Sequence, residues 1–438
     1  MPLHTDAPLR TRDVINFWIP LSATWLMMAV EGPILTSLIA RLPDPTYNLA
    51  AYGVAISLAM LIESPVIMLL SMSVALATDR HAVERLRAFT WRINALVTAG
   101  MLIVSIPAVY NVVAYGILNM PPEVAERMYA AFVCLIPWPA AIGYRRFYQG
   151  LLIRAGQTRL VAYGTVVRII SMAGSAFALA AAGAPGTLVG AISLSVGVTL
   201  EAVATRAMSF DVLRRYREQD EHELAPPPTY RDVMRFYVPL AMTSVIGFVV
   251  TPMLAFFMGR SPMSVESLAV LPVVDSFVFL FRSFGFSYQE VGIALLGERR
   301  QHLQPLQRVG AGIAIATTVV LVIVAFTPAA AWLYQGMYGL SAQLAAFAIV
   351  PTMILVPLPA LAVLYSLQRA VLISARRSVA VTWSTIVEVG LIAAVMAVLV
   401  GTINPVGVIS AAVAMVVGRI VANAYLARQT RQVLRQPA

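Results

Sequence analysis

The chain repeats the stretch Arg12-Asp13-Val14-Ile15-Asn16-Phe17-Trp18-Ile19-Pro20-Leu21 as Arg231-Asp232-Val233-Met234-Arg235-Phe236-Tyr237-Val238-Pro239-Leu240. The offset from residue 12 to residue 231 is 219, about half of the 438 residues. The same offset relates Pro33, Leu35 and Arg41 to Pro252, Leu254 and Arg260, and Gln149 to Gln368. Similarity at one fixed offset predicts a duplicated structural unit.

The composition indicates that this duplicated unit lies in a lipid bilayer. Hydrophobic residues make up 59% of the chain, charged residues only 12%, and the mean hydropathy is +0.80. A water-soluble domain has about 25% charged residues. Apolar runs of about 20 residues recur along the chain, long enough for a helix to cross a hydrocarbon core about 30 Å thick. Because the alternation typical of barrel strands is absent, we predict an all-α polytopic membrane protein.

The hydropathy pattern predicts twelve transmembrane helices in two pseudo-symmetric six-helix lobes. The expected spans are 14–40, 48–78, 88–117, 126–152, 159–182 and 187–212 in the first half, and 233–259, 266–296, 308–334, 343–373, 379–401 and 406–427 in the second. The predicted N-terminal lobe is 1–216, and the predicted C-terminal lobe is 230–438. Residues 217–229 between them are charged and then proline-rich, which predicts a solvated linker rather than a continuous helix.

The distribution of arginine predicts the orientation in the membrane. All basic side chains are Arg, and the net charge of +10 comes from short clusters between apolar spans, so topology accounts for it better than nucleic acid binding does. Most clusters fall on the same side as both termini, while the other side has Arg41, Arg127 and Arg260. The positive-inside rule therefore places both termini and the linker in the cytoplasm. We expect the membrane to be the inner, or cell, membrane. Two parallel repeats are then expected to be related by an axis along the membrane normal and to enclose a central pathway.

The sequence shows no pattern of an enzyme or a metal protein. Cys134 is the single cysteine, and His4, His81, His222 and His302 are too widely spaced in polar segments to predict a metal site. No nucleophile–base arrangement and no phosphate-binding loop of the P-loop type is found. We therefore expect no cofactor and a carrier coupled to H⁺ or Na⁺, rather than a membrane-embedded enzyme or a channel. A major-facilitator protein also has six plus six spans, but only Asp79-Arg80 faintly matches its loop motif.

Charged residues inside the predicted spans are the candidates for function, since a charge at the bilayer centre costs at least about 2.5–3.5 kcal/mol on insertion scales. They include Glu31, Glu63, Arg168, Glu201, Asp275, Arg282, Glu388 and Arg419. The repeat offset pairs Glu63 with Arg282. It also places Arg168 one residue from the position of Glu388, and Glu201 one residue from that of Arg419. One interpretation is that these acids and bases face each other across the pathway, and the other is that each charge is neutralised within its own bundle.

Arg145 and Arg146 lie near the cytoplasmic end of the fourth predicted span, beside Tyr144, Phe147 and Tyr148. They could form an anion-attracting cytoplasmic vestibule. The alternative is that they anchor the span by the positive-inside rule, with the aromatic side chains at the membrane interface.

Several stretches resemble a known family of membrane transporters. They are Phe17-Trp18-Ile19-Pro20-Leu21, then Glu31, then Leu49-Ala50-Ala51-Tyr52-Gly53-Val54-Ala55-Ile56-Ser57-Leu58, and the echo Phe236-Tyr237-Val238-Pro239-Leu240. Together they resemble the progressive ankylosis (ANK) family. That family is similar to the multidrug and toxic compound extrusion (MATE) transporters of the multidrug-oligosaccharidyl-lipid-polysaccharide (MOP) superfamily.

The resemblance implies a two-lobed MATE-like fold that works by alternating access and exports small organic or phosphate-bearing anions such as pyrophosphate, citrate or nucleotides. We assign substrate binding to Arg282, Arg168, Glu63 and Arg419, and coupling or gating to Glu31, Asp275, Glu201 and Glu388. The expected partners are an anionic small molecule and membrane lipid, and the protein is expected to be a monomer. A proton- or sodium-coupled drug exporter and a lipid-linked precursor flippase are the alternatives, although the seventh span lacks the acid that some drug exporters have.

Overall fold

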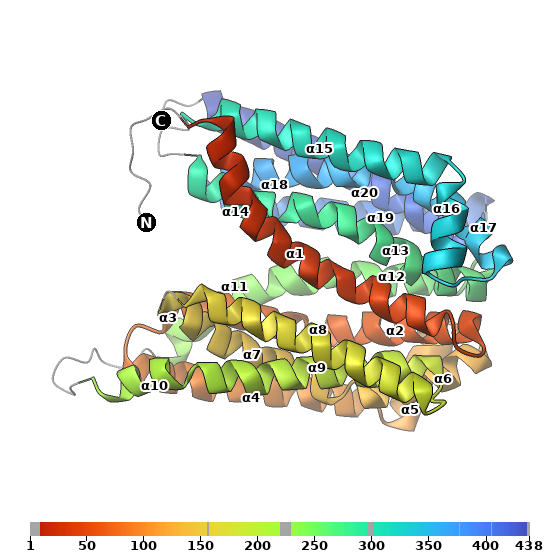
Figure 1. Ribbon diagram of the computed structural model, residues 1–438, viewed down its shortest axis with the longest axis horizontal. Coiled ribbons are helices and arrows are strands. Elements are labelled where there is room, and N and C mark those ends of the chain that lie inside the picture. Colours follow the sequence, from red (N-terminus) through yellow and green to blue (C-terminus); the bar gives the residue numbers. More distant parts are fainter. Residues whose placement is uncertain are drawn as a thin grey trace. The chain divides into compact units, whose positions relative to one another are not determined.

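The computed structural model describes residues 9–155, 157–219, 229–296, 301–375, 377–403 and 405–435. These residues form helices joined by short loops, and no strand occurs among them (Figure 1). The fold class is thus all-α, as predicted from composition. Most of the predicted linker, residues 220–228, lies outside the described residues, as do Arg299, Arg300 and Arg376 of the arginine clusters.

Several helices of the two halves begin at equivalent positions of the repeat. The first half contains α1 (Thr11–Ile39), α2 (Pro45–Glu63), η1 (Ser64–Met68), α3 (Leu69–Leu76), α4 (Arg80–Val104), α5 (Pro107–Asn111), η2 (Val112–Ile117), α6 (Pro122–Cys134), α7 (Pro137–Arg154), α8 (Thr158–Ala181), α9 (Gly186–Met208) and α10 (Phe210–Arg217). The second half contains α11 (Tyr230–Phe248), α12 (Val250–Met258), α13 (Ser264–Phe286), α14 (Tyr288–Leu295), α15 (Leu303–Phe326), α16 (Ala329–Trp332), η4 (Leu333–Met337), α17 (Ala342–Leu355), α18 (Leu358–Ser374), α19 (Ser378–Val398), η5 (Leu399–Ile403) and α20 (Gly407–Arg435). Helices α1 and α11 start 219 residues apart, as do α2 and α13, so the repeat seen in the sequence is also a repeat of helices.

Nine helical segments in the described part of the chain are long and apolar enough to cross a membrane, and a tenth results if α4 with α5 and η2, bent by 73°, counts as one. The predicted number was twelve. The difference lies in the fourth and seventh predicted spans, each of which is divided in two. One break separates α6 from α7 just before Pro137, and the other separates α11 from α12 at Val249. Pro252 explains the second break, because its missing N–H cannot bond the carbonyl of Phe248, where α11 ends.

A proline also ends α2, and a serine satisfies the backbone group that it leaves unpaired. Pro65 has no N–H to donate to the carbonyl of Leu61, and α2 gives way to the 3₁₀ turn η1 at this point. The hydroxyl of Ser64 donates to that carbonyl at 2.7 Å. Glu63 is therefore the last residue of α2, at a break in the helix rather than in its middle.

The chain divides into two compact units whose boundaries fall inside helices at prolines. The central unit is Ile34–Pro272, and the terminal unit combines Met1–Pro33 with Val273–Ala438. The first part of α1 thus belongs with the helices of the second repeat, and α11 and α12 belong with those of the first. The lobe boundaries expected from the sequence, 1–216 and 230–438, stay a prediction. The two units are defined by contacts between residues, whereas the predicted lobes are defined by the sequence repeat.

In the central unit, α11 is held against the first-repeat helices by aromatic side chains. Tyr230 lies against two guanidinium groups of α4, with Arg85 and Arg92 at 4.6 and 4.2 Å from its ring centre. About two helical turns further on, the Tyr237 hydroxyl donates to the carbonyl of Pro65 at 2.7 Å, and its ring packs edge-on against Phe89. The proline that interrupts the helix thereby supplies the acceptor that holds α11 in place.

The N-terminus of α11 is fixed by a capping box. Thr229 and Asp232 exchange hydrogen bonds, from the Thr229 amide to the carboxylate and from the Asp232 amide to the Thr229 hydroxyl. The bonds that Thr229 donates hold the pKa of the exposed Asp232 carboxyl below its usual value. The helix therefore begins at a defined residue directly after the linker.

In the terminal unit, α1 is held in the equivalent way. The indole Nε1 of Trp18 donates to the Ser287 hydroxyl at 2.9 Å and lies 3.3 Å from the Phe284 carbonyl oxygen. Trp18 is the repeat equivalent of Tyr237, and Phe284 is the equivalent of Pro65. The first helix of each repeat therefore packs in the unit that contains most of the other repeat. Equivalent hydrogen bonds, from Trp18 and from Tyr237, hold the two helices there. Around Trp18, the buried Val14 belongs to one apolar core with residues of α14, α15, α18, α19 and α20.

We expect Tyr237→Phe to lower the melting temperature of the purified protein by about 1–3 °C, because one buried hydrogen bond contributes about 1 kcal/mol. Tyr163→Phe is the matched control, since Tyr163 lies exposed on α8. Thermal unfolding in one detergent measures both variants. Equal melting temperatures for Tyr237→Phe and Tyr163→Phe would show that the crossing bond does not hold α11.

Candidate functional site

Each unit contains one cluster of charged side chains among its helices. The Glu201 cluster in the central unit consists of Glu63, Arg145, Arg146, Arg168 and Glu201. The Glu388 cluster in the terminal unit consists of Asp275, Arg282, Arg369, Glu388 and Arg419. Nine of these ten positions were expected to be functional from the sequence, and Arg369 was not.

Glu201 on α9 is the centre of the first cluster. Its side chain is fully buried and forms an ion pair with Arg145 of α7. Arg168 of α8 lies 3.8 Å from the same carboxylate, and the Gln149 amide donates to it at 3.2 Å. Helices α8 and α9 are close together here, since a Cβ on Gly164 would lie 3.2 Å from the Thr205 hydroxyl and 3.5 Å from the Glu201 side chain. One carboxylate thus joins three helices of the unit.

Arg145 lies inside the bundle in this arrangement. Only 5% of the residue is exposed, and its partner is the buried Glu201. The sequence suggested either a cytoplasmic vestibule or an anchor at the membrane interface for Arg145 and Arg146. The position of Arg145 adds a third role, which is to neutralise an acid in the interior. A vestibule at this end of α7 stays a prediction.

Glu63 lies at the end of α2, within electrostatic range of Arg145, Arg146 and Arg168. Only 5% of it is exposed, and its Oε2 accepts no hydrogen bond from the described residues. The two acids of the cluster therefore differ. Glu201 accepts directly from its neighbours, whereas Glu63 acts on the three arginines through space.

Among the described residues, no carboxylate lies at ion-pair distance from Arg146, unlike Arg145 and Arg168 of the same cluster. It follows Arg145 on α7, so its side chain leaves the helix about 100° away from the one that bonds Glu201. The residue is half-buried, and its Nε has no hydrogen-bond partner in the described part of the chain. Its interactions with Glu63 and Glu201 are electrostatic only.

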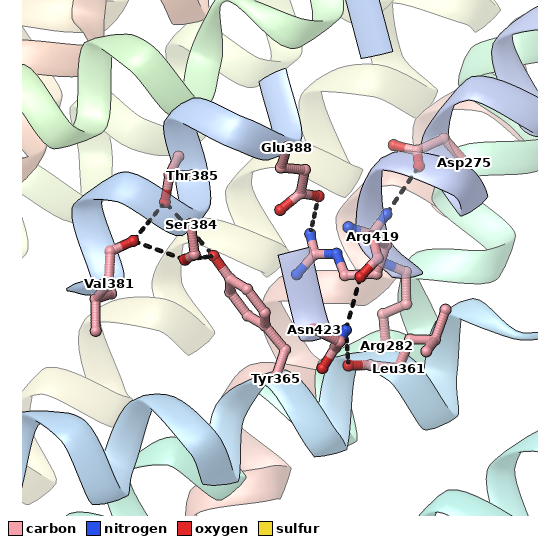
Figure 2. A network of polar contacts seen from close by, with 10 residues as sticks. All are labelled: Asp275, Arg282, Leu361, Tyr365, Val381, Ser384, Thr385, Glu388, Arg419 and Asn423. Atoms are coloured by element: carbon pink, nitrogen blue, oxygen red, sulfur yellow. Dashed lines mark hydrogen bonds and ion pairs between the residues drawn. The ribbon is translucent and has the colours of Figure 1, made fainter. Parts of the chain in front are cut away.

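The Glu388 cluster is organised by the ion pair between α19 and α20 (Figure 2). Nη2 of Arg419 lies 2.9 Å from Oε1 of Glu388, and the Arg419 guanidinium stacks 4.5 Å from the ring centre of Tyr365 on α18. The Tyr365 hydroxyl is 3.0 Å from that of Ser384, which fixes the ring against α19. The Asn423 amide bonds the carbonyl of Leu361, joining α20 to α18. These contacts connect α18, α19 and α20.

The second ion pair of this cluster lies along α13. Arg282 and Asp275 are two helical turns apart, and Nη1 of Arg282 is 3.3 Å from Oδ1 of Asp275 (Figure 2). Helix α1 passes close to this segment, since a Cβ on Gly32 would lie 2.8 Å from the Cβ of Ser276. Glu31, one residue earlier, is 8% exposed. The structure thus brings Glu31 and Asp275, two residues predicted to be coupling or gating groups, to neighbouring positions of α1 and α13.

Arg369 on α18 completes the cluster and was not predicted from the sequence. It interacts electrostatically with Arg419 and Glu388, and its guanidinium lies 5.4 Å from the ring centre of Tyr365. Its Nε has no hydrogen-bond partner among the described residues. As for Arg146 on α7, the part of the chain that the structure describes places no carboxylate at ion-pair distance from Arg369. The sequence feature that could have identified Arg369 is its position next to Gln368, the repeat equivalent of Gln149.

Backbone contacts show that Arg168 and Glu388 are structural equivalents. A Cβ on Gly197 of α9 would lie 3.1 Å from the carbonyl of Arg168, and a Cβ on Gly418 of α20 would lie 3.2 Å from that of Glu388. Glycine is required at both places, because any side chain would separate the two helices. The first helix of this hairpin therefore carries an arginine in one repeat and a glutamate in the other. The second helix carries the opposite charge in each.

This sign exchange is neutralised inside each unit, as one of the two predicted interpretations stated. Arg168 faces Glu201, and Glu388 faces Arg419, on neighbouring helices. Arg282 bonds Asp275 rather than standing alone. The hypothesis that Glu63 and Arg282 face each other across a central pathway stays a prediction. The structure adds Gln149, Tyr365, Asn423 and Arg369 to the groups that hold the clusters together.

Both clusters have the same excess charge. Counted over the ten residues named above, each contains three arginines and two carboxylates, which gives a formal charge of +1; Glu31, which lies near Asp275, is not included in this count. A buried charge without a partner is costly, and a protein retains one where a ligand or a gradient uses it. The excess lies with Arg146 in one cluster and with Arg369 in the other.

Comparison with known proteins identifies the fold. No family model and no curated protein matches the sequence. Solved structures match over nearly the whole chain: an inward-facing MATE multidrug resistance transporter of the MOP superfamily has a TM-score of 0.69 at 13% identity, covering 100% of this chain and 98% of that one. The lipid II flippase MurJ in an inward closed conformation has a TM-score of 0.72 at 12% identity, covering 95% and 90%. The chain has the MATE fold.

A third similar structure is a MOP superfamily transporter from Pyrococcus furiosus described as having a binding pocket of reversed polarity that suggests a different function. Its TM-score is 0.67 at 13% identity, covering 97% of each chain. The neighbours named in these comparisons are MATE transporters and MurJ, and the ANK-like branch expected from the sequence is not among them. The predicted MATE-like fold is confirmed.

We expect Arg419→Gln to cost about 3–5 kcal/mol of stability, because it leaves Glu388 buried without its partner. The double variant Glu388→Gln with Arg419→Gln should lose less than Arg419→Gln alone, since two amides can bond each other. The fraction of monodisperse protein and its melting temperature measure the three variants. Arg214→Gln serves as control, because Arg214 forms only exposed ion pairs. A double variant less stable than both single variants would show that the pair is not a unit.

Proposed function

We propose that this protein is a secondary active transporter that works by alternating access and exports small organic or phosphate-bearing anions. Pyrophosphate, citrate and nucleotides are the substrate candidates. The proposal includes coupling to H⁺ or Na⁺, a location in the inner membrane with both termini in the cytoplasm, and a monomeric state. The MATE fold supports a transporter, and the charge of the two clusters supports an anion as the substrate.

The excess of one arginine in each cluster is the observation that carries this proposal. Within the described part of the chain, neither Arg146 nor Arg369 has a carboxylate at ion-pair distance, and the Nε of each has no hydrogen-bond partner. A guanidinium group matches the oxygens of a carboxylate or phosphate in geometry and charge. An entering anion would supply the missing charge and hydrogen bonds. A cationic drug would instead add to the positive charge of both clusters.

The ion pairs suggest how binding could be linked to movement. Arg168 and Arg419 are engaged with Glu201 and Glu388, and Arg282 with Asp275. An anion that bonds one of these arginines competes with its carboxylate, so ligand binding and ion-pair exchange become coupled. Such a two-state arrangement gives a ligand the differential affinity that a conformational change needs.

A flippase for lipid-linked precursors is the second candidate, favoured by the TM-score of 0.72 to MurJ. Such a precursor is also anionic at its phosphates, so the same arginines could serve it. Counterflow in proteoliposomes, measured side by side with labelled pyrophosphate, citrate, ATP and a cationic dye, distinguishes these functions. Accelerated exchange of one of the anions supports the proposal. Exchange of the dye alone would overturn it, and no exchange of any soluble compound would favour the flippase.

We expect Arg369→Gln to lower the rate of anion counterflow about tenfold or more, since a hydrogen bond to a charged group contributes about 1.5–3 kcal/mol. The amount of folded protein should stay near that of the wild type, because Arg369 bonds no carboxylate. Arg308→Gln is the matched control, since Arg308 is exposed on α15 of the same unit. Unchanged counterflow in Arg369→Gln would remove Arg369 from the anion path.

A further inference from the structure

The last helix carries a basic surface that the two charge clusters do not explain. Helix α20 has 29 residues, so at about 1.5 Å per residue it is longer than the hydrocarbon core is thick. Its C-terminal part contains Arg428, Arg431 and Arg435 and no acidic residue. All three arginines are exposed, and none takes part in an ion pair in the described ranges. Their charges are therefore available to a ligand.

These arginines border a hollow on the surface of α20. The hollow has a volume of about 540 Å³ and is lined by Ala424, Ala427, Arg428, Arg431, Gln432 and Arg435. We call it the α20 groove. The small side chains of the two alanines leave the helix surface open between the long arginine side chains. The groove has the size of a phosphate-bearing headgroup rather than of a single ion.

The opposite face of this segment is fixed in the protein. Ala422, Leu426 and Val433 belong to the apolar core of the terminal unit that also contains Tyr288 and Val14. The face that carries the arginines therefore has a defined direction, away from that core. The groove is a feature of the folded unit and not of a fraying helix end.

The α20 groove continues an apolar surface toward the end of the helix. Ile420 and Val421 are 47% and 38% exposed, and they lie one turn before Ala424 on the same side. Residues 420, 424, 427, 431 and 435 follow one another at helical spacing. Exposed apolar side chains thus give way to arginines within about three turns, which is the order of acyl chain and headgroup in a phospholipid.

We propose that the α20 groove binds the headgroup of an anionic phospholipid. The phosphate lies against Arg428 and Arg431, which can each offer two N–H groups to its oxygens. The first part of the acyl chains lies along Ile420 and Val421. A free phosphate would use the arginines but would gain nothing from the apolar surface beside them. This site is independent of the transported substrate.

Lipid binding to the detergent-purified full chain tests this proposal. Dioleoyl-phosphatidylglycerol, dioleoyl-phosphatidylcholine, glycerol 3-phosphate and inorganic phosphate are added separately, and bound lipid and melting temperature are measured. We expect phosphatidylglycerol to bind and raise the melting temperature more than the other three. In the variant Arg428→Gln with Arg431→Gln and Arg435→Gln, we expect its affinity to fall about tenfold or more.

The variant Arg214→Gln with Arg215→Gln and Arg217→Gln on α10 is the matched control. It removes the same charge from another helix end, where Arg214 lies close to Asp211 and Glu218. The affinity for phosphatidylglycerol should stay near that of the wild type. Equal losses in both triple variants would show a general effect of charge and would contradict a specific site. Equal binding of inorganic phosphate would overturn the assignment to a lipid.

A second variant tests the groove without changing its charge. Ala427→Phe fills the space between the arginines and keeps all three of them. We expect it to weaken phosphatidylglycerol binding several-fold while protein yield and monodispersity stay unchanged. Undiminished binding in Ala427→Phe would contradict the groove as the place of the headgroup.

Discussion

The need to neutralise charge inside a helical bundle governs the arrangement of this protein. In each unit a carboxylate in the interior fixes arginines from neighbouring helices, Glu201 from α9 and Glu388 from α19. A charge buried without such a partner costs several kcal/mol, so these ion pairs restrict how the helices can pack. The same requirement explains why the two repeats can carry opposite charges at equivalent positions without loss of stability. Arg168 and Glu388 each have a residue of opposite charge, Glu201 and Arg419, on the neighbouring helix. The same requirement makes Arg146 and Arg369 candidates for ligand binding, because no carboxylate among the described residues lies at ion-pair distance from either.

Much of this could be read from the sequence, and the rest depended on geometry. The repeat at residues 12 and 231 predicted two equivalent sets of helices. Charges within apolar spans identified seven of the ten cluster residues, and the expected cytoplasmic vestibule included Arg145 and Arg146. The twelve predicted spans are not matched exactly by the nine or ten segments found in the described residues, because breaks near Pro137 and Pro252 divide two predicted spans. Pairing could not be predicted, since a shift of one residue turns a helix face by about 100°. Arg369 escaped notice because its repeat equivalent, Gly150, carries no charge to compare.

Helices α1 and α11, the first helices of the two repeats, each pack with helices of the other repeat. This arrangement bears on the alternating access proposed above. Trp18 and Tyr237 make equivalent hydrogen bonds to carbonyls beside helix breaks, and the unit boundaries fall at Pro33 and Pro272 within α1 and α13. Prolines in these helices weaken the backbone where the chain passes from one unit into the other. The alternating access proposed above requires rigid units joined by segments that bend. Compact units with internal ion pairs, and prolines at the unit boundaries, are consistent with that proposal.

The central claim is that each unit keeps one arginine of its cluster available for an anion. A structure determined experimentally in the presence of pyrophosphate tests this most directly. The account predicts density for the anion within hydrogen-bond distance of the guanidinium of Arg146 or Arg369. Anion density at a place that involves no cluster arginine would contradict it. So would a structure in which Glu63 and Glu388 themselves form ion pairs with Arg146 and Arg369.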